Sequence, residues 1–195
     1  MRKALQMFML IAAVGFVAPA QARAEGYVTP WVGANWGSDL TNGRAAFGVT
    51  AGGMGGGIFG GEVNFGYSPS FFGTQNDFGH NTVIDLMGNV IVGIPIGGSH
   101  PSNPSPVRPF VTAGIGLLRT QIDGGTLANV SSSNNMWGWN AGGGVMGYFN
   151  EHVGLRGDIR YLRGFEDLAT GNNVIDLSGN NQLHFWRISG GVVLR

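Results

Sequence analysis

The sequence contains no cysteine, and its only lysine is Lys3. Charged residues make up 11% of the 195 residues, well below the share of about 25% in soluble domains. The absence of cysteine excludes disulfides, so the fold must depend on packing and hydrogen bonding. A soluble domain of this size covers its surface with charged side chains. This chain has too few of them, and we therefore expect much of its surface to face something other than water.

The first 24 residues are predicted to be a cleaved secretory signal peptide. A basic start at residues 2–3 precedes an apolar run at residues 4–18, and A-R-A at residues 22–24 fits the small-x-small cleavage pattern. The run is too short for a membrane-anchor helix, which needs about 20 apolar residues. Cleavage between Ala24 and Glu25 would leave 8 basic and 11 acidic residues, a formal charge of −3. This balance lacks the basic excess that binding to nucleic acid requires.

Long apolar runs are missing from the rest of the chain. No run after residue 24 is long enough for a membrane-spanning helix. Glycine, by contrast, supplies 36 residues, far above its average share of about 7%. In lipid, a chain satisfies its backbone hydrogen-bonding groups only as helices or as a closed β-barrel. A charge-poor surface without spanning helices therefore favours a barrel.

Eight segments alternate between apolar and polar residues with the period of two that marks β-strands. The clearest is Val153–Arg163, in which Leu155 and Ile159 alternate with charged residues. The predicted strands are Glu25–Gly37, Ala45–Gly53, Ile58–Ser68, Thr82–Ile94, Arg108–Thr120, Met136–Phe149, Val153–Arg163 and Gln182–Arg195. Most have about the 9–11 residues with which a tilted strand crosses a bilayer. We predict an all-β fold, an eight-stranded antiparallel up-and-down transmembrane β-barrel over residues 25–195.

The links between these strands differ in length. Polar and mostly long links follow the first, third, fifth and seventh strands at residues 38–44, 69–81, 121–135 and 166–181, and tight turns follow the second and sixth strands at residues 54–57 and 150–152. Long loops on one side and short turns on the other are typical of outer-membrane barrels. The link at residues 95–107 is longer and contains four prolines. With both termini on the periplasmic side, we expect it to be an enlarged periplasmic turn.

The polar faces of the strands are expected to line the lumen, while the apolar faces contact lipid. The predicted inward charged residues are Glu62, Asp85, Arg156, Asp158, Arg160 and Arg187, joined by the neutral Asn35, Thr50, Asn64, Asn89, Thr112, Asn140 and Ser189. The interior of an eight-stranded barrel is just wide enough to be filled by side chains. Buried charges must be paired and hydrogen-bonded, and the three acids balance the three arginines. We interpret this set as a structural plug, with inward glycines leaving room for it.

Aromatic residues gather near the predicted strand ends. They are Trp31, Trp36, Tyr67, Trp137, Trp139, Tyr148, Phe149, Tyr161, Phe165 and Trp186. Amphipathic rings prefer the two interfaces between membrane and water. We therefore expect these side chains to form two aromatic belts around the barrel.

No cofactor, metal site or catalytic site is predicted. Two matches to a dinucleotide glycine pattern, at residues 55–60 and 142–147, lie in or beside strands, whereas the motif requires a following helix. The four histidines have no partners at metal-ligand spacing. A hydrolase triad could draw only on His184 with Ser178 and Asp176, and the last two fall in a predicted loop.

The chain resembles the OmpA/OmpX-type outer-membrane β-barrel domain. The resemblance covers about residues 25–195 and depends on Y-V-T-P-W-V-G-A-N-W-G in the first strand, G-L-R-G-D-I-R-Y-L-R in the seventh and F-W-R-I-S-G-G-V-V-L-R in the last. It implies insertion into the outer membrane by the assembly machinery. Such barrels usually end in Phe or Trp, whereas this sequence ends in Arg195.

The sequence favours a non-enzymatic, integral outer-membrane protein, expected to be a monomer. It would stabilise the envelope and present four loops outside the cell for adhesion or surface contact. One alternative is a narrow small-solute channel, which the inward glycines would permit. A less favoured one is a lipid-modifying enzyme, and a soluble barrel with an apolar ligand inside would require the opposite orientation of the strand faces.

Overall fold

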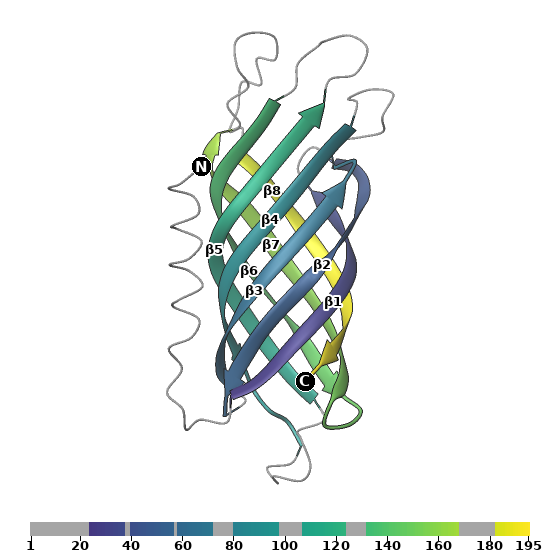
Figure 1. Cartoon of the computed structure of the whole chain (residues 1–195), viewed down its shortest axis with the longest axis vertical. Coiled ribbons are helices and arrows are strands. Elements are labelled where there is room, and N and C mark those ends of the chain that lie inside the picture. The colour runs from purple at the N-terminus through teal and green to yellow at the C-terminus, as the bar shows by residue number, and fades with distance from the viewer. Residues whose placement is uncertain are drawn as a thin grey trace.

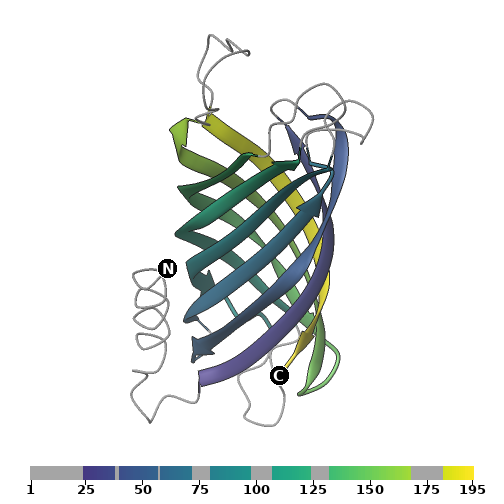
Figure 2. The ribbon, with the colours of Figure 1, turned by 45° about the horizontal axis from the view of Figure 1, so that its top comes forward.

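The computed structural model describes residues 24–37, 40–56, 58–71, 80–97, 107–123, 132–167 and 182–195. Within these ranges, eight antiparallel strands close into a barrel in which each strand pairs with its neighbours in sequence and β1 pairs with β8 (Figure 1, Figure 2). The strands are β1 (Ala24–Gly37), β2 (Leu40–Gly55), β3 (Phe59–Pro69), β4 (His80–Gly93), β5 (Val107–Asp123), β6 (Ser132–Tyr148), β7 (Val153–Asp167) and β8 (Gln182–Leu194). The predicted eight-stranded up-and-down barrel is confirmed. Residues 1–23 of the predicted signal peptide lie outside the described residues.

The two ends of the barrel differ. At the turn end, β1 begins and β8 ends, and Val28 pairs with Leu194 (Figure 2). The β2–β3 turn contains Gly56 with a φ of 59°, a left-handed conformation that favours glycine. In the β6–β7 turn, the Asn150 side chain accepts hydrogen bonds from the backbone N–H groups of His152 (2.9 Å) and Val153 (2.7 Å). Local turn chemistry thus explains both short connections. The opposite end, which carries the predicted long links, is called the loop end below.

Several strands are longer at the loop end than predicted. β2 begins at Leu40 and pairs directly with Gly37, so the predicted link at residues 38–44 is much shorter, and β7 continues to Asp167. The backbone hydrogen bonds between strands continue beyond the lipid-facing apolar residues, because polar side chains at the loop end do not prevent strand pairing. Residues 72–79, 98–106, 124–131 and 168–181, which include most of the other predicted links, lie outside the described residues. The predicted proline-rich turn begins with a bridge between Ile96 and Val107.

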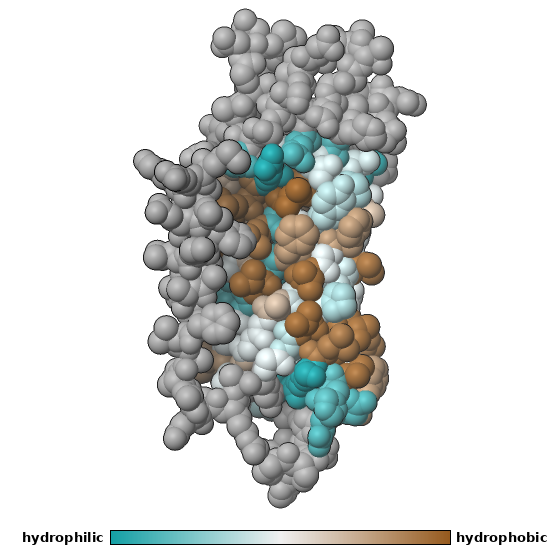
Figure 3. Space-filling view, in the orientation of Figure 1, coloured by the Kyte–Doolittle hydropathy of each residue, from teal (hydrophilic) through white to brown (hydrophobic). Residues whose placement is uncertain are grey.

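The predicted direction of the strand faces agrees with the structure. The apolar residues of the alternating pattern lie outside, as Val32 (70% exposed), Val111 (62%) and Ile188 (53%) illustrate. On the face drawn in Figure 3, hydrophobic residues occupy the middle of the wall and hydrophilic residues gather towards its two ends. These exposed apolar side chains give the wall of the barrel the exterior that lipid requires. No helix among the described residues is long and apolar enough to cross a membrane.

The interior differs from the prediction because apolar layers lie on both sides of the polar residues in its middle. An apolar layer lies towards the loop end and consists of Phe71, Val83, Met87, Leu118, Met136, Leu162, Leu183 and Phe185. A second lies towards the turn end and consists of Tyr27, Met54, Ile91, Phe110, Met146, Tyr148 and Val193. The placement of Trp31 and Tyr148 in a membrane belt was wrong, since both point inward and are 6% and 7% exposed. Their strand parity, the same as that of the inward polar residues, decides their direction.

Adjacent leucines on β5 offer a test of this orientation, because Leu117 is 42% exposed on the wall and Leu118 is fully buried in the lumen. The chain has no native cysteine, so each leucine can be replaced by a single cysteine. In folded protein in detergent, we expect Leu117→Cys to react with an apolar thiosulfonate reagent and Leu118→Cys to remain unmodified. In urea, both thiols should react. Equal reaction in the folded state would contradict the assigned faces.

An ionic core between two apolar layers

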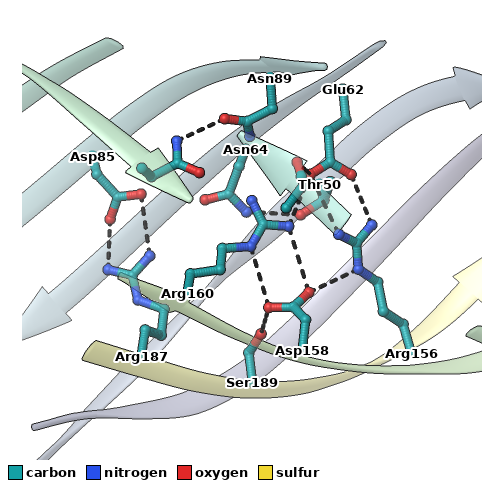
Figure 4. A network of polar contacts seen from close by, with 12 residues as sticks. Thr50, Glu62, Asn64, Asp85, Asn89, Arg156, Asp158, Arg160, Arg187 and Ser189 are labelled. Atoms are coloured by element: carbon teal, nitrogen blue, oxygen red, sulfur yellow. Dashed lines mark hydrogen bonds and ion pairs between the residues drawn. The ribbon is translucent and has the colours of Figure 1, made fainter. Parts of the chain in front are cut away.

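The six charged residues predicted to face the lumen are all buried, with exposed fractions between 0% and 7%. We call Glu62, Asp85, Arg156, Asp158, Arg160 and Arg187 the ionic core (Figure 4). They come from β3, β4, β7 and β8. The alternation on β7 places three of them in succession on the same inward face. The structure thus places the six predicted lumen-facing charges in two groups.

The larger group is a cluster of two carboxylates and two guanidinium groups. Arg156 donates to Glu62 from both terminal nitrogens (2.9 and 3.3 Å), and Arg160 Nη2 also donates to Glu62 (2.9 Å). On β7 itself, Asp158 accepts from Arg156 Nε (2.8 Å) and Arg160 Nε (3.2 Å). Each acid therefore contacts both arginines (Figure 4). Such alternation of charge compensates for the loss of water around each buried ion.

Neutral side chains complete the hydrogen bonding of the two acids. Tyr27 donates its hydroxyl to Glu62 Oε2 (2.9 Å), and Thr112 donates to Glu62 Oε1 (3.2 Å). Ser189 donates to Asp158 Oδ1 (2.8 Å). The sequence pattern placed Thr112 and Ser189 inside but not Tyr27, which shares the parity of Asn35 on β1 and was detectable from that signal. With these donors, the carboxylates are held on several sides in one fixed arrangement.

The second group is a bidentate ion pair between Asp85 and Arg187. Arg187 Nη2 lies 2.6 Å from Asp85 Oδ2, and Nη1 donates to Oδ1 at 3.1 Å. Its Nε donates to Asn35 Oδ1 (2.8 Å), and Asn35 in turn donates to Ser68 (2.7 Å). The guanidinium carbon lies 5.1 Å from the ring centre of Trp31. Arg187 thus combines a planar ion pair with an aromatic contact, which lysine could not reproduce.

Asparagines connect the two groups to the wall. The hydrogen bonds around Asn64 are satisfied when its amide oxygen accepts from Thr50 (2.7 Å) and Trp31 Nε1 (3.2 Å) and its nitrogen donates to Asp85 (3.2 Å). Asn140 on β6 donates to Asn89 on β4 at 2.6 Å. Asn64 thereby links Asp85 to Thr50 and Trp31, while Asn89 and Asn140 join β4 to β6 across the lumen.

Inward glycines make room for the ionic core, as predicted. A Cβ atom at Gly66 would overlap Asp85 Oδ2 and lie 2.6 Å from Arg187 Nη1. One at Gly114 would overlap Asn89 Oδ1. The glycines therefore serve close packing of side chains across the lumen.

The interior also contains an arginine that the sequence pattern did not single out. Arg108 on β5 is 3% exposed, lies 5.7 Å from the ring centre of Tyr148 and donates to Met54 Sδ at 3.7 Å. It has the parity of Thr112, so strand alternation alone could have found it. With Arg108, the inward charges no longer sum to zero. Arg108 lies in the turn-end apolar layer and not in the ionic core. The ionic core itself still has three acids and three arginines.

The geometry of the ionic core supports a structural role. Its two clustered carboxylates each contact two arginines, and apolar layers separate the core from both ends of the lumen. Among the described residues, no group of three or more histidine, cysteine or acidic side chains could hold a metal ion. Of the hypothetical triad, Ser178 and Asp176 lie outside the described residues, and His184 lies on the outer wall 6.3 Å from the Tyr161 ring centre.

A closed eight-stranded barrel with an apolar wall and a polar, filled lumen defines an outer-membrane β-barrel. The chain belongs to the family described as the outer membrane protein beta-barrel domain, which matches residues 8–195. The expected resemblance is thereby confirmed. No curated protein matches the chain in sequence.

Solved structures with the same fold are small outer-membrane barrels. Neisserial surface protein A is 18% identical with a TM-score of 0.61, and the match covers 87% of this chain and 96% of that one. The outer membrane protein OprG from Pseudomonas aeruginosa is 11% identical with a TM-score of 0.53 and coverages of 89% and 96%. The N-terminal barrel of OprF from the same species is 15% identical with a TM-score of 0.52 and coverages of 88% and 98%. At these identities the likeness establishes the fold.

Proposed function

We propose that this protein is a non-enzymatic, monomeric barrel that stabilises the outer membrane and presents its loop end outside the cell for surface contact. After export by a cleaved signal peptide, it would be inserted by the outer-membrane assembly machinery and surrounded by lipid. The observation that carries the proposal is the filled lumen. An ionic core between two apolar layers leaves the molecule with its outer wall and its loop end as the surfaces that can meet other molecules.

The difference between the two ends supports the orientation. The described turns at residues 56 and 150–152 lie at the end where β1 begins and β8 ends. Outer-membrane barrels keep short turns in the periplasm and longer loops outside. An adhesive role has a precedent in this fold, since a barrel 13% identical with a TM-score of 0.51 is Ail, the attachment invasion locus protein of Yersinia pestis. That likeness concerns the fold, and the surface role of this chain is our proposal.

Planar-bilayer recording distinguishes a closed barrel from the alternative of a small-solute channel. We expect the purified, folded protein to give no reproducible openings in potassium chloride, because the described interior contains two apolar layers and a paired ionic core. Recovery of folded protein, with its heat-sensitive gel migration, from the liposomes that are fused with the bilayer would serve as the control for insertion. Regular unitary openings from the wild-type chain would overturn the closed-barrel proposal in favour of a channel.

A further inference from the structure

The outer wall near the loop end carries an aromatic cluster on β6, β7 and β8. We call Trp139, Tyr161, His184 and Trp186 the aromatic shelf. The ring centre of Tyr161 lies 5.6 Å from that of Trp139, 5.1 Å from Trp186 and 6.3 Å from His184. Cross-strand pairing extends this surface, because Trp36 on β1 pairs with Trp186. The rings thus form one continuous surface over neighbouring strands.

The indole rings of the outer wall are not spread evenly around the barrel. Trp31 points into the lumen, and the four tryptophans on the outer wall all lie on β6, β8 and β1, with residue numbers 36, 137, 139 and 186. Three of them are between 36% and 41% exposed, while Trp139 is half-buried against its neighbours. Smaller rings continue around the barrel, since Phe47 on β2 and Tyr67 on β3 have ring centres 5.2 Å apart. The indole rings, which offer the largest stacking surfaces, are concentrated at the aromatic shelf and its edge, and they provide a surface on which one molecule can stack.

A cationic side chain belongs to the same sector. Arg163 on β7 is opposite Trp139 on one side and His184 on the other in the strand ladder. Its parity on β7 is that of Leu155 and Ile159, which face outward. A guanidinium group among aromatic rings on the outer wall is suited to a phosphate or phosphorylated sugar, because it donates bidentate hydrogen bonds to phosphate.

A shallow depression lies on β4, β5 and β6, beside the aromatic shelf. Its volume is about 320 Å³, and its lining residues are Val90, Val92, Val111, Thr112, Ala113, Ala141 and Gly142. It owes its depth to Ala113 and Ala141, which pair with each other between larger neighbours. Ala141 also pairs with Tyr161, so the depression begins at the edge of the aromatic shelf. Its walls are almost entirely apolar, as an acyl chain requires.

We propose that the aromatic shelf, Arg163 and the depression form a binding site for a phosphorylated, sugar-bearing lipid of the outer leaflet. A phosphate would accept hydrogen bonds from Arg163, the sugar would stack on the rings of Trp139 and Tyr161, and one acyl chain would lie in the depression beside Ala141. A phosphorylated glycolipid fits better than a second copy of the chain, because it alone combines an anion, a stacking surface and a flexible apolar chain. The site depends on the proposed orientation, with the loop end outside.

Native mass spectrometry of the full, folded chain in non-ionic detergent tests this site independently of orientation and of conductance. The probes are diphosphoryl lipid A and, for comparison, phosphatidylglycerol. We expect one lipid A to remain bound per chain and phosphatidylglycerol to be held much less. Arg163→Gln should weaken retention of lipid A about tenfold, the effect of losing a hydrogen-bonded charge. Ala141→Leu, which fills the depression, should weaken it as well.

Matched variants elsewhere on the wall control for general effects. Arg119→Gln removes an exposed arginine of β5, and Ala51→Leu enlarges an exposed alanine of β2. Both should retain lipid A like the wild type. Every variant should also fold, which is shown by a difference in gel migration between its unheated and heated samples. Equal retention of phosphatidylglycerol, unchanged retention by Arg163→Gln, or equal losses in the control variants would overturn the proposal. A dimer that does not bind lipid A would overturn the proposal and indicate that a second copy of the chain occupies the site.

Discussion

Glu62→Ala is expected to destabilise the barrel by about 3–5 kcal/mol, the cost of removing one partner from a buried ion pair. Glu62 accepts hydrogen bonds from Arg156 and Arg160, so its loss leaves two buried guanidinium groups with less compensation. The hydroxyl groups of Tyr27 and Thr112 would lose their acceptor at the same time. Equilibrium unfolding in urea, followed by the gel migration of folded and unfolded chains, measures the change.

The control for this substitution is Glu151→Ala, which removes an exposed glutamate from the β6–β7 turn. It should change the free energy of unfolding by less than about 0.5 kcal/mol. The double variant Glu62→Ala with Arg156→Ala should lose less than the sum of its single variants, because the two residues share an interaction. A loss for Glu62→Ala no larger than that of the control would contradict the structural role of the ionic core.

Phe185→Ala is expected to cost about 3–5 kcal/mol, as for other fully buried aromatic residues. Phe185 is fully buried in the loop-end apolar layer and packs edge-to-face on Phe71, with ring centres 4.9 Å apart. Its ring centre also lies 5.5 Å from the Arg187 guanidinium carbon. Alanine would therefore open a cavity in the layer and remove a contact to the ionic core.

Phe165→Ala provides the matched comparison, because this phenylalanine is 54% exposed on the outer wall of β7. Its loss should be clearly smaller than that of Phe185→Ala when both variants are unfolded in the same detergent. If the two substitutions cost the same, the loop-end apolar layer does not contribute to stability as the packing indicates.

The period of two along each strand accounts for what the sequence could predict. On β7 it placed Leu155 and Ile159 outside and Arg156, Asp158 and Arg160 inside, as the structure has them. Which side of the wall a residue faces depends only on whether its position in the strand is odd or even. The sequence of a single strand therefore assigns every residue to the lipid or the lumen, once the lipid-facing side is known. The same parity also assigns Trp31 to the lumen, where a general preference of aromatic rings for interfaces led to the wrong prediction.

Partners within the lumen could not be predicted in the same way. Which acid meets which arginine depends on the stagger between strands that are far apart in sequence, such as Asp85 on β4 and Arg187 on β8. The two apolar layers escaped prediction for a related reason. Residues such as Met87, Leu118 and Phe185 come from different strands, and only the closed barrel brings them to one level.

The placement of the ion pairs within the ring has a consequence for folding. In a ring of eight strands paired in sequence order, β3 lies opposite β7 and β4 lies opposite β8. The bond from Glu62 to Arg156 and that from Asp85 to Arg187 therefore cross the diameter of the barrel. They can form only when opposite walls have approached at the correct height. If the pairing of β1 with β8 were shifted by two residues, these charges would be separated. The two ion pairs therefore favour one closed register over the adjacent registers. They also resist flattening of the barrel.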